Sequence, residues 1–121
     1  MMEYQLIHDS TELRQLIAEN PDLPIVVLAG EEARCEWAWT YCTSVKARLS
    51  RILDVKTPYD DEERVFDDEI DFEDAVTDYV AVFFEDMPKD YPGQTEGEKI
   101  EAEIKKYKPF WRDVIAIYAT N

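Results

Sequence analysis

The strongest pattern in this sequence is a run of apolar side chains spaced three or four positions apart between residues 72 and 84. That spacing is typical of an amphipathic helix that buries one face, and it predicts a helix over residues 72–86. Asp71 is expected to cap the helix, and the acidic residues around it suit the positive end of the helix dipole. The apolar stripe comprises Phe72, Ala75, Val76, Tyr79, Val80, Phe83 and Phe84.

Two further helices are expected. Asp9 or Ser10 is expected to begin a short helix that ends near residues 20–21, and Glu12 is placed to form a capping box with Asp9. Thr95 with Glu98 forms the same pattern before a helix that ends at Pro109. The segment 87–94 between the second and third helices is expected to be a loop.

Several β-branched or alternating stretches predict strands. Residues 24–29 and 114–119 are continuous apolar runs, as in strands buried on both faces. Residues 35–42 and 44–53 alternate apolar or aromatic with polar side chains, and a short strand is expected at 64–66. Together these elements predict one α+β domain over residues 1–121, with a mixed sheet of about five strands packed against two to three helices.

The cysteines and the histidine argue against several classes of enzyme. Cys35 and Cys42 lie seven positions apart, which fits neither a zinc site nor a redox pair, and they are expected to be reduced thiols. His8 is the only histidine, so a histidine-based catalytic device or zinc centre lacks its residues. We therefore expect a non-enzymatic protein with no cofactor and no bound metal.

Charge is the other constraint on function. The 121 residues carry 28 acidic and 13 basic side chains, for a formal net charge of −15. Such a chain is repelled by nucleic acid and by anionic membranes. No apolar run is long enough to span a membrane, and no signal-peptide pattern opens the sequence. These observations predict a soluble, cytoplasmic protein that binds neither nucleic acid nor membrane directly.

The negative charge is concentrated between residues 54 and 90, where 15 acidic and three basic side chains give a net charge of −12. A surface of this kind could occupy a lysine- and arginine-lined groove built for nucleic acid. A solvated face that only keeps the protein soluble is an alternative that the sequence leaves open. The acidic candidates for partner binding are Asp60, Asp61, Glu62, Glu63, Asp67, Asp68, Glu69, Glu73, Asp74 and Asp78.

Two other uses of these carboxylates fit the sequence less well. A calcium loop requires a glycine at its sixth position, which residues 60–69 lack. Paired carboxylates could also act in general acid–base catalysis, but nothing in the sequence indicates a platform for a sugar substrate.

A second candidate surface is the expected hairpin of residues 34–51, which combines aromatic and basic side chains. Aromatic residues on one strand face are usually core, although exposed rings beside basic residues can bind a partner. The candidate residues there are Trp37, Trp39, Lys46, Arg48 and Arg51.

Three stretches of the chain resemble small acidic proteins encoded by phages and mobile elements of low-GC Gram-positive bacteria. The stretches are ELRQLIAENPDLPIVVLAGEEA, WTYCTSVKARLSRILDVKTPYDDE and FWRDVIAIYATN. Some small acidic phage products of this size are anti-CRISPR or antirestriction proteins that act as DNA mimics. The resemblance therefore implies an inhibitor of a host defence nuclease, such as a Cas effector or a restriction enzyme, with a basic groove as its target. It assigns no role to an individual residue.

Overall fold

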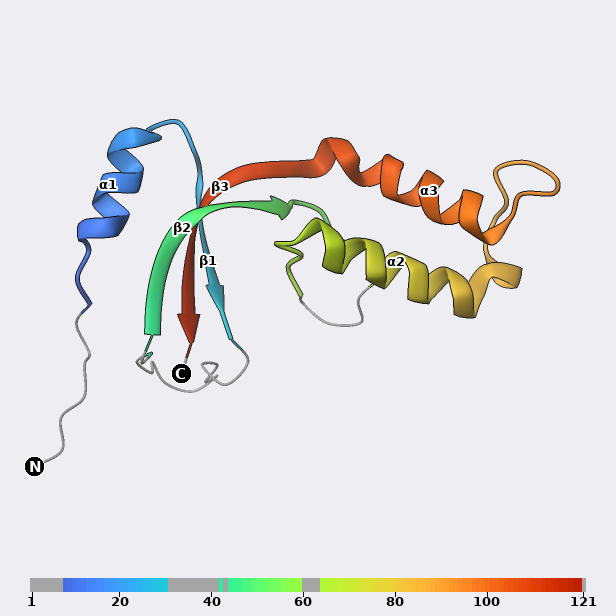
Figure 1. Ribbon diagram of the computed structural model, residues 1–121, viewed down its shortest axis with the longest axis horizontal. Coiled ribbons are helices and arrows are strands. Elements are labelled where there is room, and N and C mark those ends of the chain that lie inside the picture. The colour runs from blue at the N-terminus through green and yellow to red at the C-terminus, as the bar shows by residue number, and fades with distance from the viewer. Residues whose placement is uncertain (1–7, 31–41, 43, 60–63, 121) are drawn as a thin grey trace, which may run out of the picture. The chain divides into compact units, whose positions relative to one another are not determined.

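The computed structural model describes residues 8–30, 42, 44–59 and 64–120, and their fold is α+β (Figure 1). By their internal contacts the residues group into two compact units. Unit 1 comprises Met1–Ser50 and Asp113–Asn121, and unit 2 comprises Arg51–Arg112. The prediction of a single domain stays a prediction. No helix in the described ranges is long and apolar enough to cross a membrane.

The described elements are three α-helices, three strands and two short 3-10 turns. The helices are α1 (Thr11–Glu19), α2 (Glu69–Phe83) and α3 (Glu96–Tyr107). The strands are β1 (Ile25–Ala29), β2 (Ser44–Leu53) and β3 (Trp111–Thr120), and the 3-10 turns are η2 (Phe84–Asp86) and η3 (Lys108–Phe110).

The strands form one open sheet in the order β1-β3-β2. β1 pairs in parallel with β3, from Ile25 opposite Ile115 to Ala29 opposite Ala119. Figure 1 shows β2 on the other side of β3, running in the opposite direction. The predicted strands at 44–53 and 114–119 are confirmed, and the second is the central strand, with Val114, Ile115 and Ala116 buried.

The prediction that residues 24–29 are buried on both faces is wrong. β1 is an edge strand in which exposed and half-buried residues alternate. Ile25 is 49% exposed and Val27 is 63% exposed. A run of β-branched residues favours an extended backbone, but it does not determine what covers each face.

The predicted five strands reduce to three among the residues that the structure describes. The alternating stretch 35–42 lies outside them except for Cys42. Residues 64–66 are not a strand. The backbone N–H of Leu53 donates to the carbonyl of Phe66 at 2.9 Å, and the Phe66 ring is buried. Phe66 therefore anchors this segment by its side chain rather than by a ladder of backbone bonds.

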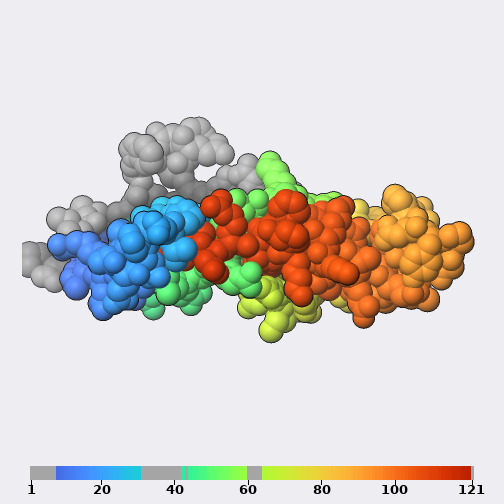
Figure 2. All heavy atoms as spheres, turned by 90° about the horizontal axis from the view of Figure 1, so that it is seen from above, coloured from blue at the N-terminus to red at the C-terminus, as the bar shows by residue number. Residues whose placement is uncertain are grey.

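Unit 2 is built on the pair of helices α2 and α3, which lie side by side (Figure 1). In the space-filling view, the visible surface of this unit includes the orange residues of α3 and the amber loop that precedes it (Figure 2). Phe72 lies at the centre of the aromatic packing, with four other rings at centroid distances of 5.2–6.0 Å in edge-to-face geometry. The buried cluster consists of Leu53, Phe66, Phe72, Val76, Val80 and Tyr107.

The predicted stripe of α2 is confirmed from Phe72 to Val80, whereas the start of the helix, its cap and the last turn of the stripe are corrected. The helix begins at Glu69, and Asp68, not Asp71, is its N-cap, with a carboxylate oxygen that accepts from the N–H of Ile70 at 2.8 Å. At the other end Phe83 is 44% exposed. The backbone tightens into η2 at the next residue, so Phe84 packs against the buried cluster instead.

The predicted capping boxes have different outcomes. At α3, the N–H of Glu98 donates to Thr95 Oγ1 at 3.2 Å, and the N–H of Thr95 donates to Glu98 Oε1 at 3.0 Å. That box is confirmed, and so is the loop before it. At α1 the N-cap is Ser10, without a side-chain cap bond. The carboxylate of Asp9 instead accepts from Thr11.

The Glu98 carboxylate provides a pH-dependent prediction. A hydrogen bond from the Tyr91 hydroxyl and bonds from Thr95 hold the pKa of Glu98 below its ordinary value. A lowered folded-state pKa adds stability above the ordinary value of 4.5, and this stability is lost as pH falls through the lowered value. Wild type should therefore be more stable than Glu98→Gln at neutral pH, and the difference should disappear in acid. Denaturant unfolding from about pH 7 to about pH 3 measures it.

The matched control for this experiment is Glu101→Gln. Glu101 is exposed on the same helix, and its side chain has no hydrogen bond or ion pair with a described residue. The variant removes the same charge from the same element. A difference between wild type and Glu98→Gln that stays constant with pH, or that Glu101→Gln reproduces, would contradict the prediction.

Candidate functional site

The ten acidic candidates fall into three groups in the structure. Asp60, Asp61, Glu62 and Glu63 lie outside the described residues. Asp67 is half-buried just before α2, and Asp68 caps the helix. Glu69 forms an ion pair with Arg51, with 2.6 Å between Glu69 Oε1 and Arg51 Nη1. Asp68 thus stabilises the start of α2, and Glu69 links that start to the end of β2.

Glu73, Asp74 and Asp78 form the third group. All three are exposed on α2, as expected for residues away from its apolar stripe. Within the described ranges no basic side chain lies within ion-pair distance of these three carboxylates. The helix beneath them is fixed by the fully buried Val76 and Val80.

Two basic members of the second candidate surface, Arg48 and Arg51, have intramolecular contacts. Trp37 and Trp39 lie outside the described residues. Lys46 and Arg48 lie two positions apart on β2, and both are exposed. The Arg48 guanidinium lies 4.4 Å from the centre of the Tyr118 ring. Arg51 has the opposite strand parity and pairs with Glu69.

A hollow of about 750 Å³ lies beside α2, and we call it the acidic–aromatic hollow. Positions i, i+3 and i+7 of one helix face supply its carboxylates, and aromatic rings supply much of its apolar lining. The carboxylates are those of Asp71, Asp74 and Asp78, and the rings are those of Tyr59, Tyr79 and Phe83.

One end of this hollow is occupied by a basic side chain of the chain itself. Arg64 Nη2 lies 3.7 Å from Asp71 Oδ2. The same guanidinium lies 4.8 Å from the centre of the Phe66 ring. Asp74 and Asp78 were predicted as members of the acidic surface, whereas Asp71 was expected only as a helix cap. Tyr59 and Arg64 lie outside α2 and meet it only through tertiary packing, so the sequence does not indicate their place in the hollow.

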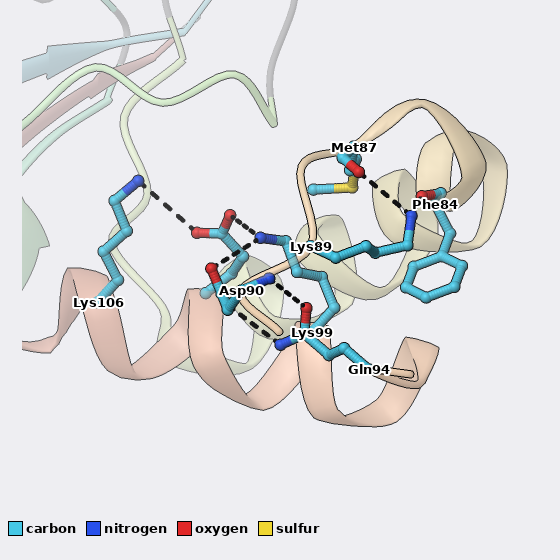
Figure 3. A network of polar contacts seen from close by, with 8 residues as sticks. Phe84, Met87, Lys89, Asp90, Gln94, Lys99 and Lys106 are labelled. Carbon is cyan, nitrogen blue, oxygen red and sulfur yellow. Dashed lines mark hydrogen bonds and ion pairs between the residues drawn. The ribbon is translucent and has the colours of Figure 1, made fainter. Parts of the chain in front are cut away.

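A second hollow, of about 650 Å³, shares Tyr59, Tyr79 and Phe83 with the first and extends to α3. Lys99 is the notable residue there, because only 6% of its side chain is exposed. Its Nζ lies 3.6 Å from Asp90 Oδ1 and 3.6 Å from Glu103 Oε1 (Figure 3). The sequence placed Lys99 on a charged helix and gave no sign of its burial.

The polar groups around Lys99 connect the loop before α3 to the helix. The buried amide of Gln94 donates to the Asp90 carboxylate at 3.0 Å, while the N–H of Asp90 donates back to Gln94 Oε1 at 3.1 Å (Figure 3). The bond from Gln94, and then the charge of Lys99, lower the pKa of Asp90. Burial, followed by the nearby charge of Glu103, raises the pKa of the Tyr59 hydroxyl. The contacts of Gln94 and Lys99 with Asp90 therefore hold the loop against the start of α3.

The remaining chemical candidates form no cluster. The His8 Nε2 donates to the carbonyl oxygen of Cys42 at 2.9 Å, which holds the imidazole against the backbone. Cys42 itself is a half-buried free thiol. Across residues 8–30, 42, 44–59 and 64–120, no group of three or more potential ligands is placed to hold a metal ion.

Comparisons of the chain with protein-family models, with curated proteins and with solved structures find no match.

Proposed function

We propose that this chain is a non-enzymatic inhibitor of a host defence nuclease, of the anti-CRISPR or antirestriction type, and that its acidic surface occupies a nucleic-acid-binding groove. The observation that carries the proposal is the set of exposed carboxylates on α2. Glu73, Asp74 and Asp78 are exposed, and none has a basic partner among the described residues. A small acidic protein of a phage or mobile element, acting in the bacterial cytoplasm, fits this use.

The rigidity of α2 supports this function. Phe72, Val76 and Val80 are almost completely buried, so the opposite side of the helix presents its carboxylates from a fixed backbone. Asp71, Asp74 and Asp78 follow one another at rises of about 4.5 and about 6 Å along the axis. Phosphates follow one another at about 3.4 Å along one strand of DNA, so the helix offers a sparser row of charge of the same sign.

Exposed apolar residues beside the charges favour a protein partner over water alone. Ile70 is 67% exposed and Val82 is 72% exposed on the same helix. A surface kept only for solubility has no need of large apolar side chains among its acids, whereas a binding surface combines the two.

The test is inhibition of DNA cleavage by purified restriction enzymes and Cas effectors of the host, using wild type and two charge-reversed variants. Asp74→Lys with Asp78→Lys changes the α2 surface. Asp22→Lys with Glu101→Lys makes the same change in net charge at exposed positions elsewhere. The α2 variant should lose inhibition by about 100-fold, and the control by less than about threefold. Raising the salt from about 50 to about 500 mM should weaken inhibition by wild type.

Two outcomes would contradict this function. One is a panel in which no nuclease is inhibited. The other is equal inhibition by wild type and the α2 variant. If a partner is captured equally well by both and remains bound at high salt, the surface of residues 34–51 becomes the better candidate.

A further inference from the structure

The second hollow is lined by apolar and by polar residues, and all of them belong to unit 2. Tyr59 connects the two kinds. Its ring lies 5.1 Å from that of Tyr79 between centroids, and burial, followed by the neighbouring Glu103 carboxylate, raises the pKa of its hydroxyl. A volume of about 650 Å³ is typical of sites that enclose a small organic ligand. The aromatic rings, prolines and methionine of the lining are those of Pro58, Tyr59, Tyr79, Phe83, Met87 and Pro88.

The polar residues of this hollow have hydrogen-bonding capacity that the described chain leaves unused. Lys99 Nζ lies 3.6 Å from Asp90 Oδ1 and 3.6 Å from Glu103 Oε1, which are ion-pair distances too long for hydrogen bonds. Only 6% of the Lys99 side chain is exposed, so water has little access to it. Glu103 Oε2 is buried and accepts no hydrogen bond from a described residue. Because buried polar groups without hydrogen bonds are destabilising, a group that both donates and accepts would be stabilised here.

The charges around the hollow favour a neutral ligand. The ammonium groups of Lys99 and Lys106 lie 3.6 and 3.9 Å from the two oxygens of Glu103, and they would repel a further cation at this carboxylate. An anion would instead meet the carboxylates of Asp86, Asp90 and Glu103, which also line the hollow. A carboxamide carries no charge and presents an N–H donor next to a carbonyl acceptor, so it avoids both repulsions.

We propose that the second hollow binds a small neutral ligand that carries a carboxamide on an aromatic ring. The amide N–H would donate to the Glu103 carboxylate, and the carbonyl oxygen would accept from the Lys99 ammonium. The ring would pack beside Tyr59 and Tyr79, since aromatic rings favour offset or edge-to-face contacts. Lys106, whose side chain is 65% exposed, can turn into solvent to admit the ligand. The inference is independent of the proposed function, because the exposed carboxylates of α2 on which that function rests do not line this hollow.

The test compares benzamide with two analogues in NMR titrations of the full chain. Wild type should bind benzamide with a Kd of about 1 mM, a typical value for so small a ligand. N,N-dimethylbenzamide keeps the ring and the carbonyl but has no N–H, and it should bind at least about fivefold more weakly. Benzylamine should also bind at least about fivefold more weakly at about 150 mM salt, because Lys99 and Lys106 repel its charge. The backbone amide shifts caused by benzamide should be largest at Tyr59 and at residues 99–106.

A variant that fills the hollow provides a second measurement. Ala102 is half-buried and lines the hollow, so Ala102→Leu reduces its volume without a change of charge and should weaken benzamide binding at least about tenfold. Gly97→Leu is the control, since Gly97 lies on the same helix but not in the lining. A Cβ at Gly97 would meet no atom within 4 Å. This variant should change benzamide binding less than about twofold.

Three results would overturn the inference. They are the absence of saturable shifts with benzamide, equal binding of benzamide and either analogue, and equal effects of Ala102→Leu and Gly97→Leu. If Ala102→Leu does not fold, as judged by circular dichroism, the comparison of the three ligands on wild type decides alone. Nuclease inhibition by wild type without benzamide binding would reject this site and keep the proposed function. Benzamide binding without inhibition of any nuclease would do the reverse.

Discussion

Replacing Phe72 by alanine is expected to lower the free energy of unfolding by about 3–5 kcal/mol. The Phe72 side chain is 1% exposed, and rings of Tyr59, Phe66, Tyr107 and Trp111 surround it. Removing it takes away both the burial of the ring and the edge-to-face contacts, and rigid neighbours can fill only part of the space. Since domains are commonly stable by about 5–15 kcal/mol, the variant would be marginal.

Denaturant unfolding followed by circular dichroism measures this effect, with Phe83→Ala as the control. Phe83 lies on the same helix, but its ring is 44% exposed, and its removal should cost less than about 1 kcal/mol. Equal losses for the two phenylalanines would show that the cluster around Phe72 is not the core of unit 2.

Removing the charge of Lys99 is expected to be the second large effect. Lys99→Met leaves the side chain of Glu103, which is 12% exposed, without its closest basic neighbour. One oxygen of this carboxylate, Oε2, is already buried without a hydrogen-bond partner in the described structure. Breaking a buried ion pair from one side typically costs about 3 kcal/mol, because the remaining charge stays desolvated.

The double variant Lys99→Met with Glu103→Leu tests whether the unpaired Glu103 charge causes the loss of stability. With both charges replaced by apolar groups, the loss should be clearly smaller than for Lys99→Met alone, as measured by denaturant unfolding. Lys106→Met is the control, since Lys106 is 65% exposed and its Nζ lies 3.9 Å from Glu103 Oε2. A double variant as unstable as the single one, or a Lys106→Met loss of similar size, would contradict the interpretation of Lys99 as a buried ionic anchor.

Local signals of the sequence predicted the three helices and the three strands that the structure describes, although the strand expected at 64–66 is absent. The stripe of α2 repeats over several turns, and the Thr95–Glu98 box fixes the start of α3, so both helices could be located. Features that depend on neighbouring elements were predicted less well. Four acidic residues precede or begin α2, and the sequence does not determine which of them caps it. The change from α-helix to 3-10 turn after Phe83 cannot be recognised from the spacing of the apolar residues.

In the candidate site too, local features could be predicted and features that depend on neighbouring elements could not. Asp74 and Asp78 were predicted to be exposed because their positions avoid the apolar stripe, and the structure confirms this. The rest of the hollow could not be predicted, since Tyr59 and Arg64 lie outside α2 and meet it only through tertiary packing. Lys99 is the clearest omission, because a lysine on a helix rich in charge is normally solvated.

The pairing of β1 with β3 also sets an order of events during synthesis. Ile25 and Ile115 pair directly although 90 positions separate them in the chain, whereas the buried cluster of unit 2 draws on residues 53–107. Contacts between residues close in sequence form sooner than distant ones, because closing a shorter loop costs less entropy. While the ribosome is still making the chain, the apolar β1 must therefore wait without its partner until β3 emerges, and the helical pair of unit 2 can assemble first.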